Sequence, residues 1–177
     1  MRPLFVLAGL LAACGSGMGS SDGSMLDYSP PIPTGSFAET ARHVVPDNPM
    51  GVSGIHNGRR QVIQDAATWA SIWHEMTAEQ FPKPELPAVD FATETVLVAA
   101  MGDCMSNGFT IGVDGVFAAP DGSVTAGVSS VSPDPMCMMM MGQVMTQPLD
   151  AVAIPKASAV SFAERMGMSM CTNNMGM

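Results

Sequence analysis

The sequence of 177 residues contains few basic and few aromatic residues. It has 7 Lys+Arg against 16 Asp+Glu, a formal net charge of −9, and only 6% aromatic residues. Nucleic-acid binding needs a basic patch for the phosphates. We therefore expect no nucleic-acid partner.

Motifs that would indicate an enzyme are also lacking. The sequence contains no phosphate-binding P-loop. His74-Glu75 begins an H-E-x-x-H zinc motif, but position 78 is alanine where the motif needs its second histidine. The other histidines, His43 and His56, lie too far apart in sequence to argue a zinc site. We expect a protein without catalytic activity and without a cofactor.

The N-terminal hydrophobic run is too short to span a bilayer. It covers Leu4–Ala13, follows a single positive charge at Arg2, and has the length of a signal-peptide core. It ends in Leu11-Ala12-Ala13-Cys14, which is similar to a bacterial lipobox with Cys14 as the lipidated residue. Two or three acyl chains on one residue anchor a protein stably. We predict a signal peptide at residues 1–13 and a mature protein anchored through Cys14 in the bacterial cell envelope, on its periplasmic or surface face.

Glycine, serine and proline dominate the sequence after Cys14. Residues 15–36 read GSGMGSSDGSMLDYSPPIPTGS and offer little to bury. A flexible linker of this length reaches roughly 25 Å. The domain prediction is a lipidated N-terminus and tether at 14–40, one globular domain at 41–165, and a methionine-rich tail at 166–177.

The clearest helix signal follows Asp65, which can cap a helix by accepting backbone N–H bonds. Trp69, Ile72, Trp73 and Met76 then recur at helical spacing and form one apolar stripe. We expect both tryptophans to lie in the core.

Strand patterns dominate the rest of the domain. The apolar run Val96–Met101 indicates a strand covered on both faces. Further strands are expected at Phe109–Val113, Ser123–Val131, Val144–Ile154 and Ala159–Phe162, with a turn at Asp121-Gly122. The predicted fold class is α+β: a small antiparallel, meander-like β-sheet with one or two packed helices.

Three segments, in this order and spacing, resemble the C-terminal domain of the protease complex subunit PrcB family. They are SGIHNGRRQVIQDAATWASIWHEMTA (Ser53–Ala78), LPAVDFATETVLVAAMGDCMSNGFTIGV (Leu86–Val113) and GQVMTQPLDAVAIPK (Gly142–Lys156). The resemblance implies a small non-catalytic β-rich domain, often on exported lipoproteins, with one named member associated with a surface protease. The sequence departs from the family at Asn107-Gly108, where Gly-Gly is common, and in its methionine-rich segments.

Methionine is the most unusual component. Six of the 18 methionines fall within Met136–Met145, MCMMMMGQVM. In a meander, the turn with Cys104, the loop with Cys137 and the tail with Cys171 would meet at one end of the sheet. Cysteines that meet in an oxidising compartment normally pair. We predict a Cys104–Cys137 disulfide, with Cys137–Cys171 as the alternative.

Exposed methionine has three interpretations besides a functionally silent surface. It suits an adaptable partner-binding patch, a soft-metal site for Cu(I), or oxidant scavenging through sulfoxide formation. In an extended segment, Met138 and Met140 would share one face. The candidate metal ligands are Met136, Met138, Met140, Met168, Met170 and Cys171.

The leading functional prediction is a lipid-anchored accessory or protein-interaction domain of the envelope. Its expected partners are the membrane, through the lipid, and an envelope protein such as a surface protease complex. The alternative is a Cu(I)-binding or oxidant-scavenging protein that uses a pole rich in methionine and cysteine.

Overall fold

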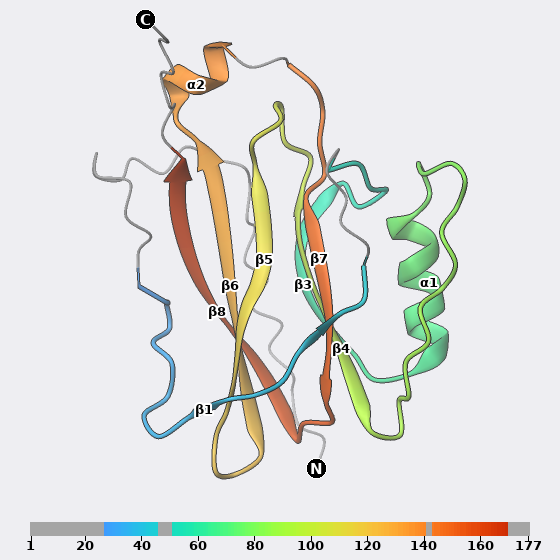
Figure 1. Ribbon diagram of the computed structural model, residues 1–177, viewed down its shortest axis with the longest axis vertical. Coiled ribbons are helices and arrows are strands. Elements are labelled where there is room, and N and C mark those ends of the chain that lie inside the picture. Colours follow the sequence, from blue (N-terminus) through green and yellow to red (C-terminus); the bar gives the residue numbers. More distant parts are fainter. Residues whose placement is uncertain (1–26, 46–50, 141–142, 170–177) are drawn as a thin grey trace, which may run out of the picture.

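The structure is a computed structural model that describes residues 27–45, 51–140 and 143–169. Two four-stranded sheets and one long helix make up most of the described chain (Figure 1). Sheet A has the strand order β1-β5-β6-β8, and sheet B has the order β2-β7-β4-β3. The predicted α+β class is confirmed, but a single meander is wrong.

The strand and helix bounds are as follows. Sheet A contains β1 (Phe37–Ala38), β5 (Thr110–Ala118), β6 (Ser123–Pro133) and β8 (Ala159–Ser169). Sheet B contains β2 (Arg42–His43), β7 (Leu149–Pro155), β4 (Glu94–Gly102) and β3 (Asn57–Ile63). The helices are α1 (Ala66–Met76) and α2 (Pro135–Met140). All neighbours are antiparallel except β6 and β8, which run parallel over their whole length.

Strand β4 explains why the sheets separate. Val96, Val98 and Ala100 belong to the apolar core shared with α1. Leu97 and Ala99 belong to a second core, shared with sheet A. A strand that is apolar on both faces needs cover on both, and β4 obtains it from α1 on one face and from sheet A on the other. The chain therefore crosses to the other sheet after β4 instead of continuing as a meander.

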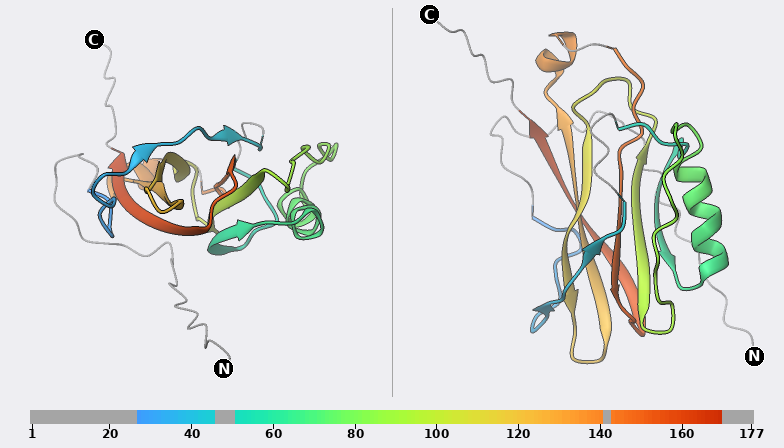
Figure 2. Two further views of the ribbon diagram at one scale, coloured as in Figure 1. Left: turned by 90° about the horizontal axis from the view of Figure 1, so that it is seen from below. Right: turned by 45° about the vertical axis from the view of Figure 1, so that its right-hand side comes forward.

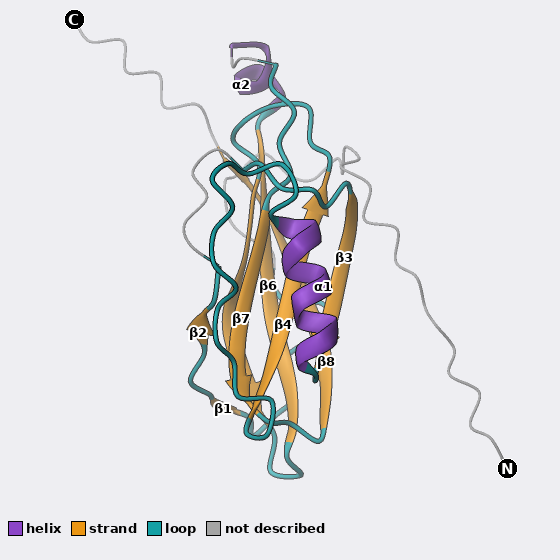
Figure 3. Ribbon diagram, turned by 90° about the vertical axis from the view of Figure 1, so that its right-hand side faces the viewer, coloured by secondary structure: helices purple, strands orange, loops and turns teal. Residues whose placement is uncertain are grey.

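Helix α1 lies over the outer face of sheet B (Figure 3). Its predicted cap is present, since Asp65 Oδ1 accepts a bond from the Thr68 backbone N at 2.8 Å. The predicted stripe is buried, with Trp69 and Met76 each only 2% exposed. This part of the sequence prediction is confirmed.

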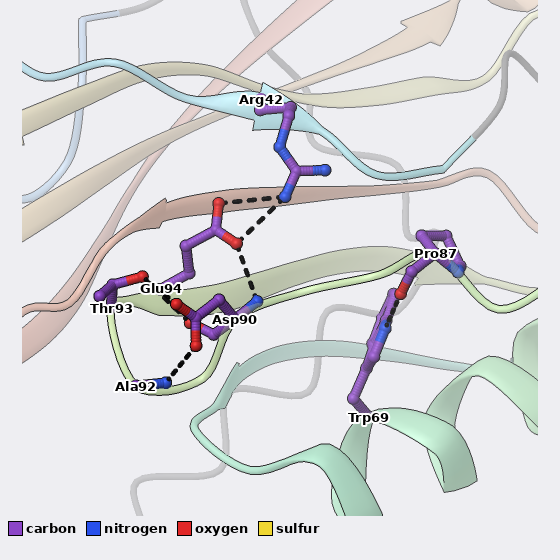
Figure 4. A network of polar contacts seen from close by, with 7 residues as sticks. All are labelled: Arg42, Trp69, Pro87, Asp90, Ala92, Thr93 and Glu94. Carbon is purple, nitrogen blue, oxygen red and sulfur yellow. Dashed lines mark hydrogen bonds and ion pairs between the residues drawn. The ribbon is translucent and has the colours of Figure 1, made fainter.

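The segment between α1 and β4 is fixed to the helix and to β2. Trp69 Nε1 donates to the Pro87 carbonyl at 3.1 Å (Figure 4). Glu94, at the start of β4, accepts two bonds from Arg42, at 3.0 and 3.2 Å, and one from the Asp90 backbone N at 3.1 Å (Figure 4). The Asp90 N–H and then the Arg42 guanidinium lower the pKa of Glu94. The long connection is thereby held against the domain.

Two polar ties join the sheets. Arg60 on β3 makes a bidentate ion pair with Glu164 on β8, at 2.7 and 2.8 Å, and donates to the Ala100 carbonyl at 2.8 Å. Asp150 on β7, only 7% exposed, accepts a bond from the Val113 backbone N on β5 at 2.8 Å. Such charge-assisted bonds are stronger than neutral ones, and they fix how the two sheets lie against each other.

The N-terminal part of the described chain is attached to the domain earlier than predicted. Ser29 and Glu164 exchange backbone bonds at 2.7 and 2.9 Å, and the Tyr28 ring lies against Gly127. The Tyr28 hydroxyl donates to Asp114, and burial followed by that bond raises the pKa of Tyr28 to about 12. The chain then crosses from sheet A to sheet B through β1 and β2 (Figure 2). The predicted tether, residues 14–40, therefore overlaps the folded domain from Tyr28 onward.

Candidate functional site

Exposed apolar side chains gather at one end of the sandwich. The ends of β4, β6 and β8 and the starts of β5 and β7 lie there, together with α2 (Figure 1). Eight large apolar side chains of the described residues are exposed. Four of them belong to loops or α2 at this end, and we name them the methionine pole: Met105 (70% exposed), Met136 (70%), Val144 (52%) and Met145 (52%).

An isolated β-bridge creates the centre of this surface. Cys104 and Thr146 exchange backbone bonds at 2.8 and 2.9 Å, and both side chains are buried. In antiparallel pairing, the next residues on the two chains are also opposite each other and point to the other face. Met105 and Met145 adjoin the bridged pair on the two segments, and unlike Cys104 and Thr146 their side chains are exposed.

Helix α2 corrects the expected shape of the methionine run. Asp134 caps it by accepting a bond from the Met136 backbone N at 2.7 Å, and Pro135 is its first residue, a favoured position for proline. Met136 is exposed, Cys137 is buried and Met138 is half-buried. In a helix, positions 136 and 138 are about 200° apart, so the predicted Met136-x-Met138 ligand spacing does not place two thioethers on one face.

The predicted disulfide is wrong in its first form. Cys137 is disulfide-bonded, whereas Cys104 takes no part in a disulfide. Cys104 is held beside Thr146 at the end of β4, while Cys137 lies in α2 with its Sγ 3.9 Å from the Ser169 carbonyl oxygen. The alternative pair, Cys137–Cys171, stays a prediction, because Cys171 lies outside the described residues.

The other predicted site residues are spread over different elements. Met168 is half-buried on β8, and Met140 is the last residue of α2. Met170 and the lipidation residue Cys14 lie outside the described residues. Within the described parts of the chain, no group of three His, Cys, Asp or Glu side chains is placed to hold a metal.

A polar network that the sequence analysis missed lies next to the methionine pole. Asp103 Oδ1 accepts bonds from Gln147 Nε2 and His56 Nδ1, both at 2.9 Å. The Gln147 oxygen in turn accepts from the Ser53 backbone N at 3.2 Å, and Glu79 lies 3.6 Å from His56 Nε2. The network connects the loop before Met105 to the loop after Met145. Only the T-Q-P segment hinted at it in the sequence.

These bonds also set the charges of the network. The Gln147 amide, and then the His56 ring, hold the pKa of Asp103 below its usual value. The hydrogen bond to Asp103 is the largest cause of a raised pKa at His56. Asp103 is therefore negatively charged at neutral pH, at the edge of the methionine pole.

The opposite end of the sandwich contains an open hollow of about 310 Å³. It lies under the β1 segment, between the β5–β6 turn and the β7–β8 turn. Its lining is mainly apolar, with Glu39 and Lys156 as its only charged side chains. Its lining includes Phe37, which is 56% exposed.

Comparison with known proteins assigns no relative. No family model matches the chain, and no curated protein or solved structure matches it either. Among the described residues, no helix is both long and apolar enough to cross a membrane.

Proposed function

We propose that this protein is a non-catalytic, lipid-anchored accessory domain of the bacterial envelope that binds a protein partner through the methionine pole. The observation that carries the proposal is the exposure of Met105 and Met145, which adjoin the buried Cys104–Thr146 bridge, with Met136 and Val144 exposed at the same end. Apolar side chains gathered in this way mark interaction sites. Methionine is unbranched and polarisable, so it adapts to a partner's shape.

The resemblance to the PrcB family supports a surface protease complex as the kind of partner. The three segments that carry the resemblance contain β3, α1, β4 and β7, which are three of the four strands of sheet B and its covering helix. The soft-metal alternative has less support, because α2 separates the predicted thioether ligands at Met136 and Met138.

Polar substitution of the pole should abolish partner binding without unfolding the protein. The triple variant Met105→Gln, Met136→Gln and Met145→Gln changes only exposed side chains, so we expect a change in unfolding free energy within about 0.5 kcal/mol per site. In-cell crosslinking followed by mass spectrometry should give a partner with the wild type and lose it with the variant. Phe37→Gln, at the other end, is the control that should retain it. Equal recovery with all three proteins would refute the proposed surface.

Substitution of Cys14 by serine should release the protein from the membrane fraction or leave an unprocessed precursor. The reason is that the thiol of Cys14 is the expected attachment point of the lipid, and the peptidase that cleaves before it acts on the lipidated form. Fractionation and intact-mass analysis test both outcomes, with Cys104→Ala as the control that should remain membrane-bound. A processed Cys14→Ser protein that stays on the membrane would contradict lipid anchoring.

A further inference from the structure

The methionine pole is apolar at its centre and acidic at its edge. Its residues come from 102–110 and from the described parts of 134–148, and over both ranges the sequence contains Asp103 and Asp134 and neither Lys nor Arg. Asp103 is exposed, and His56 contacts both Asp103 and Glu79, so two carboxylates share one imidazole at this edge. The whole chain adds to this local charge with its net −9.

We propose that the partner segment bound by the pole is a cationic amphipathic helix, with apolar side chains on one face and lysine or arginine beside them. This rests on the proposed function and specifies its partner. Flexible methionine side chains can accommodate the apolar face of a helix. The carboxylates at the edge would attract the basic side chains and orient the helix.

Charge also distinguishes a cationic helix from two other partners that an apolar surface could bind, a lipid membrane and a second copy of the chain. Anionic lipid headgroups bind basic protein segments, and residues 102–110 and 134–148 contain no Lys or Arg. A second copy of the chain would place the same acidic edge against itself, which is unfavourable. A cationic partner is the one whose charge complements the pole.

Two synthetic peptides test the proposal with the mature Cys14→Ser chain, which avoids binding of the peptides to lipid. One peptide has Leu and Lys at amphipathic helical spacing, and its matched counterpart has Glu in place of Lys. We expect fluorescence anisotropy to show about tenfold or greater preference for the Lys peptide at low salt, and a loss of that preference near 0.5 M salt as screening increases.

Three variants locate the site. The triple methionine variant should remove binding of the Lys peptide, whereas Phe37→Gln should leave it unchanged. Asp134→Asn should weaken binding several-fold, because it removes a charge but keeps an oxygen that can cap α2. Circular dichroism should show the same fold in each variant.

Several results would overturn the proposal. They are equal affinity for the two peptides, no binding of either, binding that the triple variant leaves intact, or pole-dependent binding to vesicles containing phosphatidylglycerol. Pole-dependent self-association in sedimentation velocity would also overturn it. If crosslinking still gives a partner that the triple variant loses, only the cationic helix is refuted. If the triple variant changes neither assay, the proposed function is refuted as well.

Discussion

Replacing Trp69 by alanine should lower the free energy of unfolding by about 3–5 kcal/mol, the usual cost of removing a large aromatic side chain from a core. Trp69 is only 2% exposed, and its ring centre lies 5.5 Å from that of Trp73. Its indole N–H also holds the Pro87 carbonyl, so the substitution loosens the connection to β4. Since a domain has only about 5–15 kcal/mol of stability, much of it would be lost.

Urea unfolding followed by far-UV circular dichroism measures this effect. Ser71→Ala, on the exposed face of the same helix, is the matched control and should change stability by less than about 0.5 kcal/mol. Trp69→Phe should fall between the two, because it keeps most of the packing and loses the bond to Pro87. A loss below about 1 kcal/mol for Trp69→Ala would mean that α1 does not anchor sheet B.

Loss of the Cys137 disulfide should cost about 3–4 kcal/mol if its partner is Cys171, because the bond would close a loop of about 35 residues. Two contacts of the described residues support this pairing. The Asp134 backbone N donates to the Ser169 carbonyl at 3.0 Å, and Cys137 Sγ lies 3.9 Å from the same oxygen. Ser169, the last residue of β8, therefore lies beside α2, and it precedes Cys171 by two residues in the sequence.

Peptide mapping without reduction should therefore yield a linked peptide containing Cys137 and Cys171. Reducing agent should destabilise the wild type in urea and have no further effect on Cys137→Ser. Cys104→Ala should retain the sensitivity to reducing agent. A peptide that links Cys104 to Cys137 would contradict both the structure and this prediction.

Local signals in the sequence were sufficient for α1. The capping residue Asp65 and the four apolar residues at helical spacing all lie within twelve consecutive residues, Asp65–Met76, and the structure confirms both the cap and the buried stripe. The two apolar faces of β4 were also read correctly. The strands that pair with β4 were not predicted correctly. Two apolar faces show that a strand is covered on both sides, but they do not show which strands lie beside it. The parallel pairing of β6 with β8 joins segments separated by α2 and β7, and nothing in either segment specifies it.

The candidate site was predicted in part. The sequence placed the methionine run and Cys104 at one end, and the structure has Cys104 and α2, which contains the described start of the run, at the same end although the topology differs (Figure 1). Met105 and Met145 were not among the candidate site residues, since their place beside the bridge between Cys104 and Thr146 depends on contacts between segments far apart in the sequence. The short helix α2 was also missed. Its signal, Asp134-Pro135, was present, but the methionines after it have no polar face that would indicate a helix.

The pairing of the first and last described segments has a consequence for the order in which the chain can fold. Ser29 pairs with Glu164, and the Arg60–Glu164 ion pair joins residues 104 positions apart. Contacts between residues so far apart in sequence form slowly, because closing the long loop between them costs conformational entropy before the contact stabilises the chain. Strand β6 also gains its second neighbour only when β8 arrives. A chain that passes through a secretion channel N-terminus first, as the proposed anchoring requires, would therefore complete sheet B only when β7 emerged and sheet A only when β8 emerged.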